Sequence, residues 1–117
     1  MDGDQARRFA AEWIAAWNSH NLDAVLEHYD DSVRLTSPAA ARILGDPAGT
    51  IEGKAALRAY FARALEVYPD LQFELMDVMW GLASVVLYYR NQVGTCGEFM
   101  ELNVVGKVVR VVANYAG

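Results

Sequence analysis

The chain has 117 residues, 54% of them hydrophobic, and carries 10 basic against 15 acidic side chains, for a net charge of −5. This length predicts one domain, residues 1–117, with a real core, and the acidic balance argues against a nucleic-acid partner. No apolar run approaches the ~20 residues of a membrane helix, and the amino terminus has no signal-peptide layout, so we expect a cytoplasmic protein with no membrane partner.

Cysteine and histidine are scarce. Cys96 is the only cysteine, so no disulfide can form within the chain, and the two histidines lie far from it in the sequence. A zinc site would have too few ligands. We therefore expect neither a metal nor another cofactor.

The first half of the chain predicts helices. Residues 4–19 repeat apolar side chains with helical period and place Trp13 and Trp17 one turn apart, on one face. A second, shorter helix opens at Asn21 and closes at Asp30, with Tyr29 facing inward. Residues 33–37 then alternate as a strand, which ends at the following proline.

A long loop and a third helix complete this half. Residues 38–53 are rich in Ala, Gly, Pro and Asp, which predicts a loop of a length often found in lids. Residues 53–68 follow as a helix, with Tyr60 and Phe61 among its inward positions.

The second half predicts an antiparallel meander. Residues 71–80, 83–93, 98–105 and 108–115 are rich in Val, Leu and aromatic residues, with glycines between them. Three helices and a strand before such a meander indicate an α+β fold. We expect helices to cover one face of a curved sheet.

One acidic residue breaks the apolar pattern of these strands. Glu98 alternates with Met100, Leu102 and Val104, so it should share a buried strand face with them. An ionised carboxyl in an apolar interior costs several kcal/mol unless it is paired, protonated or open to a polar cavity. A cavity would make Glu98 a candidate site residue.

Several short motifs occur together in a familiar order. They run Trp13-Ile14-Ala15-Ala16-Trp17-Asn18, Tyr29-Asp30-Asp31-Ser32-Val33, Ile51-Glu52-Gly53-Lys54 and Gly106-Lys107-Val108-Val109. Over almost its whole length the chain resembles the SnoaL-like and nuclear transport factor 2-like superfamily. The resemblance implies a cone-shaped sheet, mixed or antiparallel, wrapped around three helices to enclose an apolar pocket. Members include ketosteroid isomerase, polyketide cyclases, epoxide hydrolases, scytalone dehydratase and non-catalytic binders, so the fold does not select a function.

The resemblance to ketosteroid isomerase can be followed residue by residue. Aligned at Gly106-Lys107-Val108-Val109, Glu98 takes the place of the protonated acid, Trp13 that of the tyrosine donor and Ser37 that of the aspartate base. A serine hydroxyl cannot accept a proton at neutral pH without a partner base, which argues against ketosteroid isomerase activity. An epoxide hydrolase centre has no evident match either, because Arg90 and Arg110 alternate with inward positions.

The same alignment and strand parity predict the pocket. We expect Glu98 as its acid or base, with Trp13 and Ser37 as hydrogen-bond donors. The predicted ligand-binding lining is largely apolar: Trp17, Tyr29, Leu35, Tyr60, Phe61, Leu87, Tyr89, Asn91, Met100, Val111 and Tyr115. Such a lining suits a small hydrophobic molecule held by one or two hydrogen bonds.

Four side chains have alternative placements. The Trp13 indole needs an acceptor if buried, and Glu98 is a candidate. Glu98 itself is either the acid of the pocket or a strand-end residue that reaches solvent beside Gly97. Asp77 would point inward by strict alternation, or outward if a bulge interrupts the strand. His28 is either solvated or at the pocket mouth. Arg42, in the predicted loop, is either solvated or closes over an anionic ligand.

The outward face of the meander mixes aromatic residues with arginines, which is more typical of an interface than of bare surface. Val86, Tyr88, Phe99 and Val112 alternate there with charged and amide residues. The resemblance also implies homodimerisation through this face. We therefore expect a homodimer.

Two functions stay open. One is an enzyme of the isomerase, cyclase or hydrolase type acting on a small carbonyl or polyketide-like compound, with Glu98 at a raised pKa. The other is a non-catalytic binder of a small hydrophobic molecule, or a dimeric interaction module. Besides these two functions, the cavity could be filled by its own side chains, so that only the dimer matters.

Overall fold

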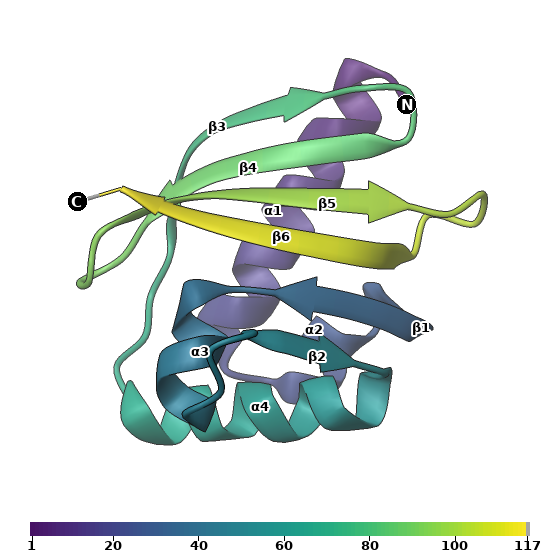
Figure 1. Ribbon diagram of the computed structural model, residues 1–117. Helices are drawn as coiled ribbons and strands as arrows, with labels where there is room; N and C mark the ends of the chain where they lie inside the picture. The colour runs from purple at the N-terminus through teal and green to yellow at the C-terminus, as the bar shows by residue number, and fades with distance from the viewer. Residues whose placement is uncertain (117) are drawn as a thin grey trace.

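A computed structural model describes residues 1–116, which form four helices and one six-stranded sheet (Figure 1). In chain order the elements are α1 (Gly3–Ser19), α2 (Leu22–Leu26), β1 (Tyr29–Thr36), α3 (Pro38–Leu44), β2 (Thr50–Glu52), α4 (Lys54–Val67), β3 (Glu74–Trp80), β4 (Ser84–Arg90), β5 (Thr95–Leu102) and β6 (Val108–Ala116). None of the helices in residues 1–116 is long and apolar enough to cross a membrane.

The sheet is mixed, with strand order β2-β1-β6-β5-β4-β3. The four late strands pair as antiparallel neighbours, which confirms the predicted meander. β1 joins β6 in parallel and pairs with β2 in antiparallel orientation. The predicted α+β class is therefore confirmed.

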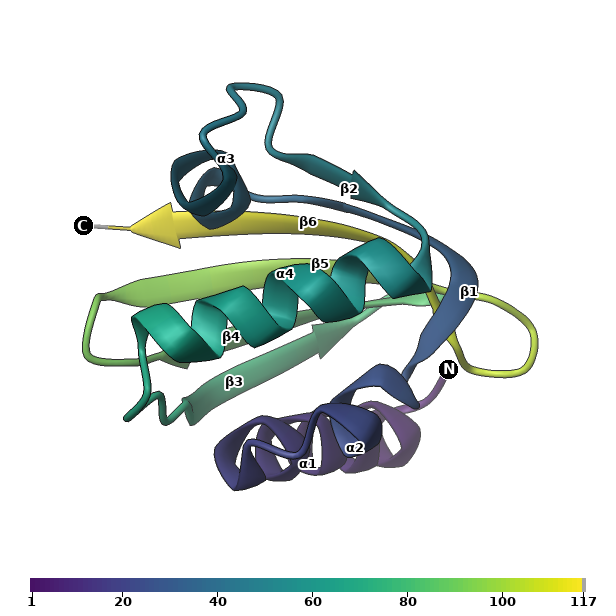
Figure 2. The same ribbon diagram turned by 90° about the horizontal axis from the view of Figure 1, so that it is seen from below.

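The helices lie against one side of the curved sheet. α1 packs against β3 at one end of the sheet, and α4 packs against β1 and β2 at the other. Figure 2 shows the sheet bending around the space between these helices, with α4 running across its open side. This arrangement is the cone that the resemblance implies, and it places inward side chains of late strands opposite those of α1 and α4.

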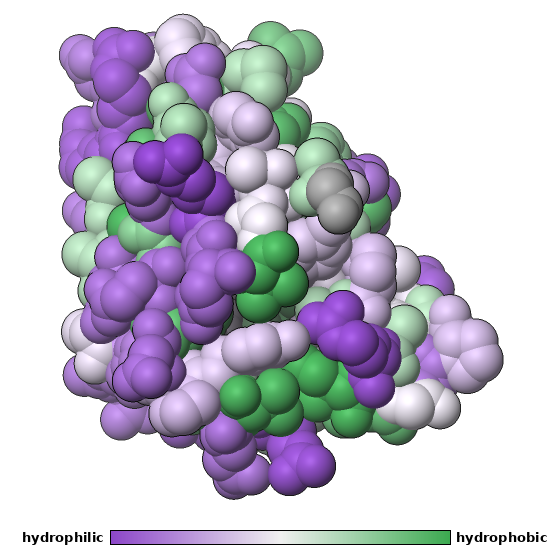
Figure 3. Space-filling model, turned by 90° about the vertical axis from the view of Figure 1, so that its left-hand side faces the viewer, coloured by the Kyte–Doolittle hydropathy of each residue, from purple (hydrophilic) through white to green (hydrophobic). Residues whose placement is uncertain are grey.

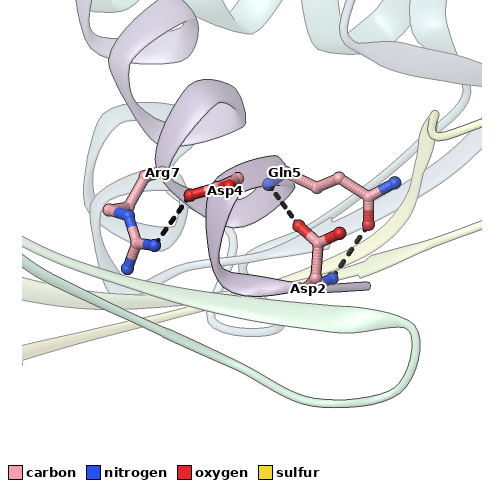
Figure 4. Close-up of polar contacts among 4 residues, drawn as sticks. All are labelled: Asp2, Asp4, Gln5 and Arg7. Carbon is pink, nitrogen blue, oxygen red and sulfur yellow. Dashed lines mark hydrogen bonds and ion pairs between the residues drawn. The ribbon is translucent and has the colours of Figure 1, made fainter.

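The first helix begins at a capping box. Asp2 Oδ1 accepts a hydrogen bond from the Gln5 backbone N–H at 2.8 Å, and Gln5 Oε1 accepts one from the Asp2 N–H at 2.9 Å (Figure 4). Asp4 and Arg7 form an exposed ion pair one turn along. The opposite face of the helix is apolar and buried, and it brings Trp13 and Trp17 into the core.

The prediction of a plain loop at residues 38–53 is wrong. Ser37 caps α3 by accepting a hydrogen bond from the Ala39 N–H at 3.1 Å, Pro38 opens the helix, and Gly45 ends it in a left-handed conformation (φ 68°). After a short turn, β2 pairs with β1. These start and stop signals were present in the sequence, but the small residues between them carry too little hydrophobic periodicity to reveal a helix.

One further expectation needs correction. The second helix ends at Leu26, and Tyr29 is buried on β1 rather than on a helix.

Of the two alternatives for Asp77, the outward one is confirmed. An extra residue between Leu75 and Asp77 shifts the pairing with β4, so Val78 turns toward the core and Asp77 is exposed.

Candidate functional site

A cavity of about 90 Å³ opens between α1, α4 and the inner face of the sheet, with α3 at its edge. Most of its walls are aromatic or aliphatic, as predicted for this family of folds. The residues lining it are Trp13, Trp17, Leu35, Ser37, Ala39, Arg42, Ile43, Tyr60, Phe61, Ala64, Tyr68, Leu71, Phe73, Tyr89, Asn91, Val93, Glu98, Ala113 and Tyr115.

Strand register places Glu98 on the wall of this cavity. On the inner face it lies in one cross-strand row with Leu87 and Ala113, and the adjacent row holds Tyr89, Cys96 and Tyr115. Because residues two apart share a face, Glu98 and Cys96 point to the same side as Met100. Glu98 is only 6% exposed, so its burial agrees with the expectation from its strand.

The Glu98 carboxyl has two protein donors, both on one oxygen. Tyr89 Oη donates to Oε1 at 2.6 Å, and Cys96 Sγ lies 3.8 Å from the same atom. Within residues 1–116, Oε2 receives no hydrogen bond from the protein. Burial raises the pKa of Glu98 to about 7, although both hydrogen bonds act in the opposite direction. The group can therefore exchange a proton near neutrality.

The Trp13 indole does not serve Glu98. Its Nε1–H donates to Tyr29 Oη at 3.0 Å, and its ring stacks on Phe73 with centroids 5.6 Å apart. The donor that we expected Trp13 to offer to a ligand is thus already used inside the core. Trp17 differs, because its buried Nε1 has no hydrogen-bond partner among residues 1–116.

Hydroxyl groups supply most of the remaining polarity. Ser37 is buried, and its Oγ is occupied as acceptor by the α3 cap, which leaves its proton to donate. Burial raises the pKa of Tyr60 to about 12 and raises that of Tyr115 as well, with the nearby Glu98 charge adding to both effects. These phenols stay protonated at neutral pH and act as donors, not as bases.

The open end of the cavity has a different character. Arg42 on α3 donates from Nη2 to Tyr68 Oη at 3.2 Å and is exposed, as are Val93 and Tyr115. Asn91 shapes the turn after β4 by accepting from the Val93 and Gly94 N–H groups. Figure 3 looks at the end of the molecule that carries the C-terminus, where hydrophobic patches lie between hydrophilic groups.

Ten of the predicted site residues line the cavity: Trp13, Trp17, Leu35, Ser37, Tyr60, Phe61, Tyr89, Asn91, Glu98 and Tyr115. Four do not, namely Tyr29, Leu87, Met100 and Val111, which are buried in the core. Met100 and Val111 pair in the inner-face row that lies on the far side of the Glu98 row from Tyr115. Tyr29 is covered by Trp13 and Phe61. Facing inward is therefore not sufficient to reach the cavity.

The predicted list missed part of the lining. α3 contributes Ala39 and Ile43, the end of α4 contributes Ala64 and Tyr68, and the segment before β3 contributes Leu71 and Phe73. The α3 residues were hidden by the loop prediction. The residues of α4 and of the segment before β3 line the cavity because the chain crosses the open side of the cone there. Hydrophobic periodicity does not predict that path.

His28 lies away from this cavity, contrary to one alternative. Its ring meets Phe9 edge-on at 5.4 Å, and burial lowers its pKa. It borders a separate, open groove beside α1. Among the described residues, no group of three or more His, Cys, Asp or Glu side chains is arranged to hold a metal ion.

Similarity to known proteins identifies the family. A model of the SnoaL-like domain matches residues 10–111. The protein belongs to the SnoaL-like family. A search of curated proteins finds no significant match.

Solved structures agree with the SnoaL-like assignment. A SnoaL-like protein of unknown function from Burkholderia thailandensis E264 is 38% identical, with 99% of this chain and 98% of that one covered and a TM-score of 0.94. A candidate isomerase of the SnoaL-like family from Agrobacterium tumefaciens C58 is 19% identical (97% and 99% covered, TM-score 0.78). A candidate ketosteroid isomerase from Kribbella flavida DSM 17836 is 18% identical (97% and 79% covered, TM-score 0.71). The last two likenesses show the fold alone.

The buried carboxyl predicts a distinctive pH dependence of stability. Since the pKa of Glu98 is raised from 4.5 to about 7, the folded state holds a proton that the unfolded state has released between these values. The contribution of Glu98 to the free energy of unfolding is therefore fully present below pH 4.5. It is lost as the pH rises through about 7, and the total loss is roughly 3 kcal/mol. Relative to Glu98→Gln, the wild-type protein should lose about this much between about pH 4 and about pH 9.

Urea unfolding of both proteins across this range measures the difference. Glu101→Gln is a matched control, because Glu101 lies on the same strand but is partly exposed and pairs with Arg110. In Glu101→Gln the free energy of unfolding should change with pH as it does in the wild type. Parallel stability curves for wild type and Glu98→Gln would show that the Glu98 pKa is not raised by folding.

Proposed function

We propose that the cavity binds a small carbonyl compound and that Glu98 moves a proton to or from the carbon next to its carbonyl group. The observation that carries this proposal is the buried Glu98 carboxyl on the cavity wall with its pKa raised to about 7. A group with a pKa near the working pH is suited to both accept and return a proton. Isomerisation through an enol or enolate is the reaction class that needs only one such group.

The proton balance of this step is simple. Ionised Glu98 removes a proton from the α-carbon, the C–H electron pair becomes the C=C bond of the enolate, and negative charge develops on the carbonyl oxygen. The Ser37, Tyr60 and Tyr115 hydroxyls lining the cavity are candidate donors to that oxygen. Protonated Glu98 then returns the proton to the same or to a conjugated carbon, which regenerates the carboxylate.

The size of the cavity limits the ligand. Its volume of about 90 Å³ is below the ~300–1,000 Å³ of sites that enclose drug-sized ligands. A compound of a few carbon atoms fits this space better than a fused-ring polyketide or steroid. Ser37 also argues against a steroid substrate, since it occupies the position where ketosteroid isomerase chemistry would need an aspartate.

Deuterium exchange tests this proposal. Wild-type protein incubated with pentan-2-one, hexan-2-one and cyclohexanone in deuterium oxide should accelerate incorporation of deuterium at the α-carbon, followed by proton NMR. Glu98→Gln should reduce the acceleration by about 10² or more, the usual contribution of a positioned acid–base group. Glu101→Gln should leave it unchanged.

The outcomes separate the two functions. Full exchange activity in Glu98→Gln would remove Glu98 from the reaction. Ligand-induced shifts of the Trp13 and Trp17 indole signals without exchange would favour the alternative of a non-catalytic binder. Absence of both exchange and shifts with every ketone would contradict the proposal.

We also propose that two copies associate through the outer face of the sheet. An unbroken cross-strand row runs Met79–Val86–Phe99–Val112 from β3 to β6, and Arg110 lies over the Phe99 ring with its guanidinium carbon 5.1 Å from the ring centroid. An apolar row flanked by polar and charged residues can pack on a second copy of itself about a two-fold axis. The row crosses four strands, so such a contact would extend over most of the sheet.

Sedimentation equilibrium at micromolar concentration tests the dimer. Wild-type protein should sediment with twice the mass of the chain, and Phe99→Glu should sediment as a monomer because it places a charge in the middle of the row. Val105→Glu, at an exposed position in the β5–β6 turn, is the control and should remain dimeric. A monomeric wild-type protein would contradict this interface.

A further inference from the structure

Among residues 1–116, the cavity lining contains two residues with a carboxyl or guanidinium side chain, and they differ in exposure. Glu98 is buried on the cavity wall, where it accepts a hydrogen bond from Tyr89. Arg42 is exposed at the mouth, on α3. A ligand that fills the cavity would meet both an acid and a cation.

Arg42 is held at the mouth by a hydrogen bond but has no carboxylate partner among residues 1–116. Its described hydrogen bond goes to the Tyr68 hydroxyl at 3.2 Å, and none of the six ion pairs formed among residues 1–116 includes it. A guanidinium has five N–H donors in a planar fork, so one bond to Tyr68 leaves most of them available. In a chain with 15 acidic side chains, an arginine free of them beside an apolar cavity is positioned for an anion from outside.

The Arg42 and Glu98 side chains line one cavity, so a single small molecule can contact both. Tyr60 lies on the same lining: burial and the Glu98 charge raise its pKa, whereas the Arg42 charge lowers it. The aromatic walls would cover the sides of a short methylene chain that joins the two groups of such a molecule.

A monocarboxylate suits this mouth better than a phosphate. Arg42 is the one basic residue on the described lining, and a planar guanidinium matches a planar carboxylate through two parallel hydrogen bonds. A dianion would need further positive charge, and the net charge of −5 opposes it.

We infer that the ligand is a short-chain keto acid whose carboxylate is bound by Arg42 at the mouth and whose carbonyl group lies beside Glu98. This inference rests on the proposed proton transfer by Glu98 and names the substrate class for that same site. It makes Arg42 a specificity-determining residue. It also assigns α3 a role in binding, since this helix carries both Arg42 and the Ser37 cap.

Matched pairs of probes test it. The keto acids are 5-oxohexanoate and 7-oxooctanoate, and the neutral partners are hexan-2-one and octan-2-one, in which a methyl group replaces the carboxylate. Titrations are followed by the indole N–H signals of Trp13 and Trp17 in NMR spectra. Trp80, which packs on Arg7 outside the cavity, is an internal control.

Wild-type protein should bind at least one keto acid roughly tenfold or more tightly than its neutral partner, the scale of a hydrogen bond to a charged group. Arg42→Gln should remove this preference while leaving ketone affinity within about twofold, and added salt should weaken only the keto acids. Arg8→Gln, an exposed arginine on α1 away from the cavity, should behave as wild type.

Equal affinities within both pairs, or an equal loss for acid and ketone in Arg42→Gln, would overturn the inference and leave the proposed function standing. Failure of all four probes to shift Trp13 or Trp17 would overturn both. Binding of a keto acid without deuterium exchange at its α-carbon would support the ligand class and contradict proton transfer.

Discussion

The candidate site depends on one constraint, the burial of the Glu98 carboxyl in an aromatic cavity. Water would keep this group ionised, whereas the cavity removes most of that solvation and supplies two donors to a single oxygen. The loss of solvation outweighs the hydrogen bonds, so the carboxyl titrates near neutrality. A structural role alone does not explain this cost, since an apolar residue would fill the same position without it.

The fold holds this arrangement in place from three sides. The parallel joining of β1 to β6 brings Leu35 next to Val111, which carries the end of β1 and the α3 cap to the cavity. α1 supplies the tryptophans from behind, and α4 closes the open side of the cone with Tyr60 and Phe61. The polar groups are thus set on rigid elements, while α3 and the turn after β4 form the mouth.

Much of this was predictable because it follows from two periodicities. Strand alternation placed Glu98 and Tyr89 inward, and helical period placed Trp13, Trp17 and Phe61 inward. Periodicity failed where geometry departs from regular alternation, as at the bulge before Asp77, and where small residues form a helix, as in α3. It also could not separate core from cavity: Met100 and Val111 face inward with Glu98, but their row lies where side chains fill the space.

Hydrogen-bond pairing was the least predictable level. From sequence alone Trp13 and Glu98 were plausible partners, yet the indole bonds Tyr29 and the acid bonds Tyr89. The choice depends on where each side chain lies in three dimensions, which strand parity does not specify. It matters for function, because it leaves one oxygen of Glu98 without a protein donor among residues 1–116.

The burial of Glu98 is tested most directly by its own pKa, measured by carbon-13 NMR of the labelled side-chain carboxyl during a pH titration. We expect a midpoint near the raised value of about 7, and a still higher one in Tyr89→Phe, where the carboxylate loses its stronger donor. A midpoint near the ordinary value of 4.5 would show a carboxyl that water reaches freely, and it would contradict the candidate site.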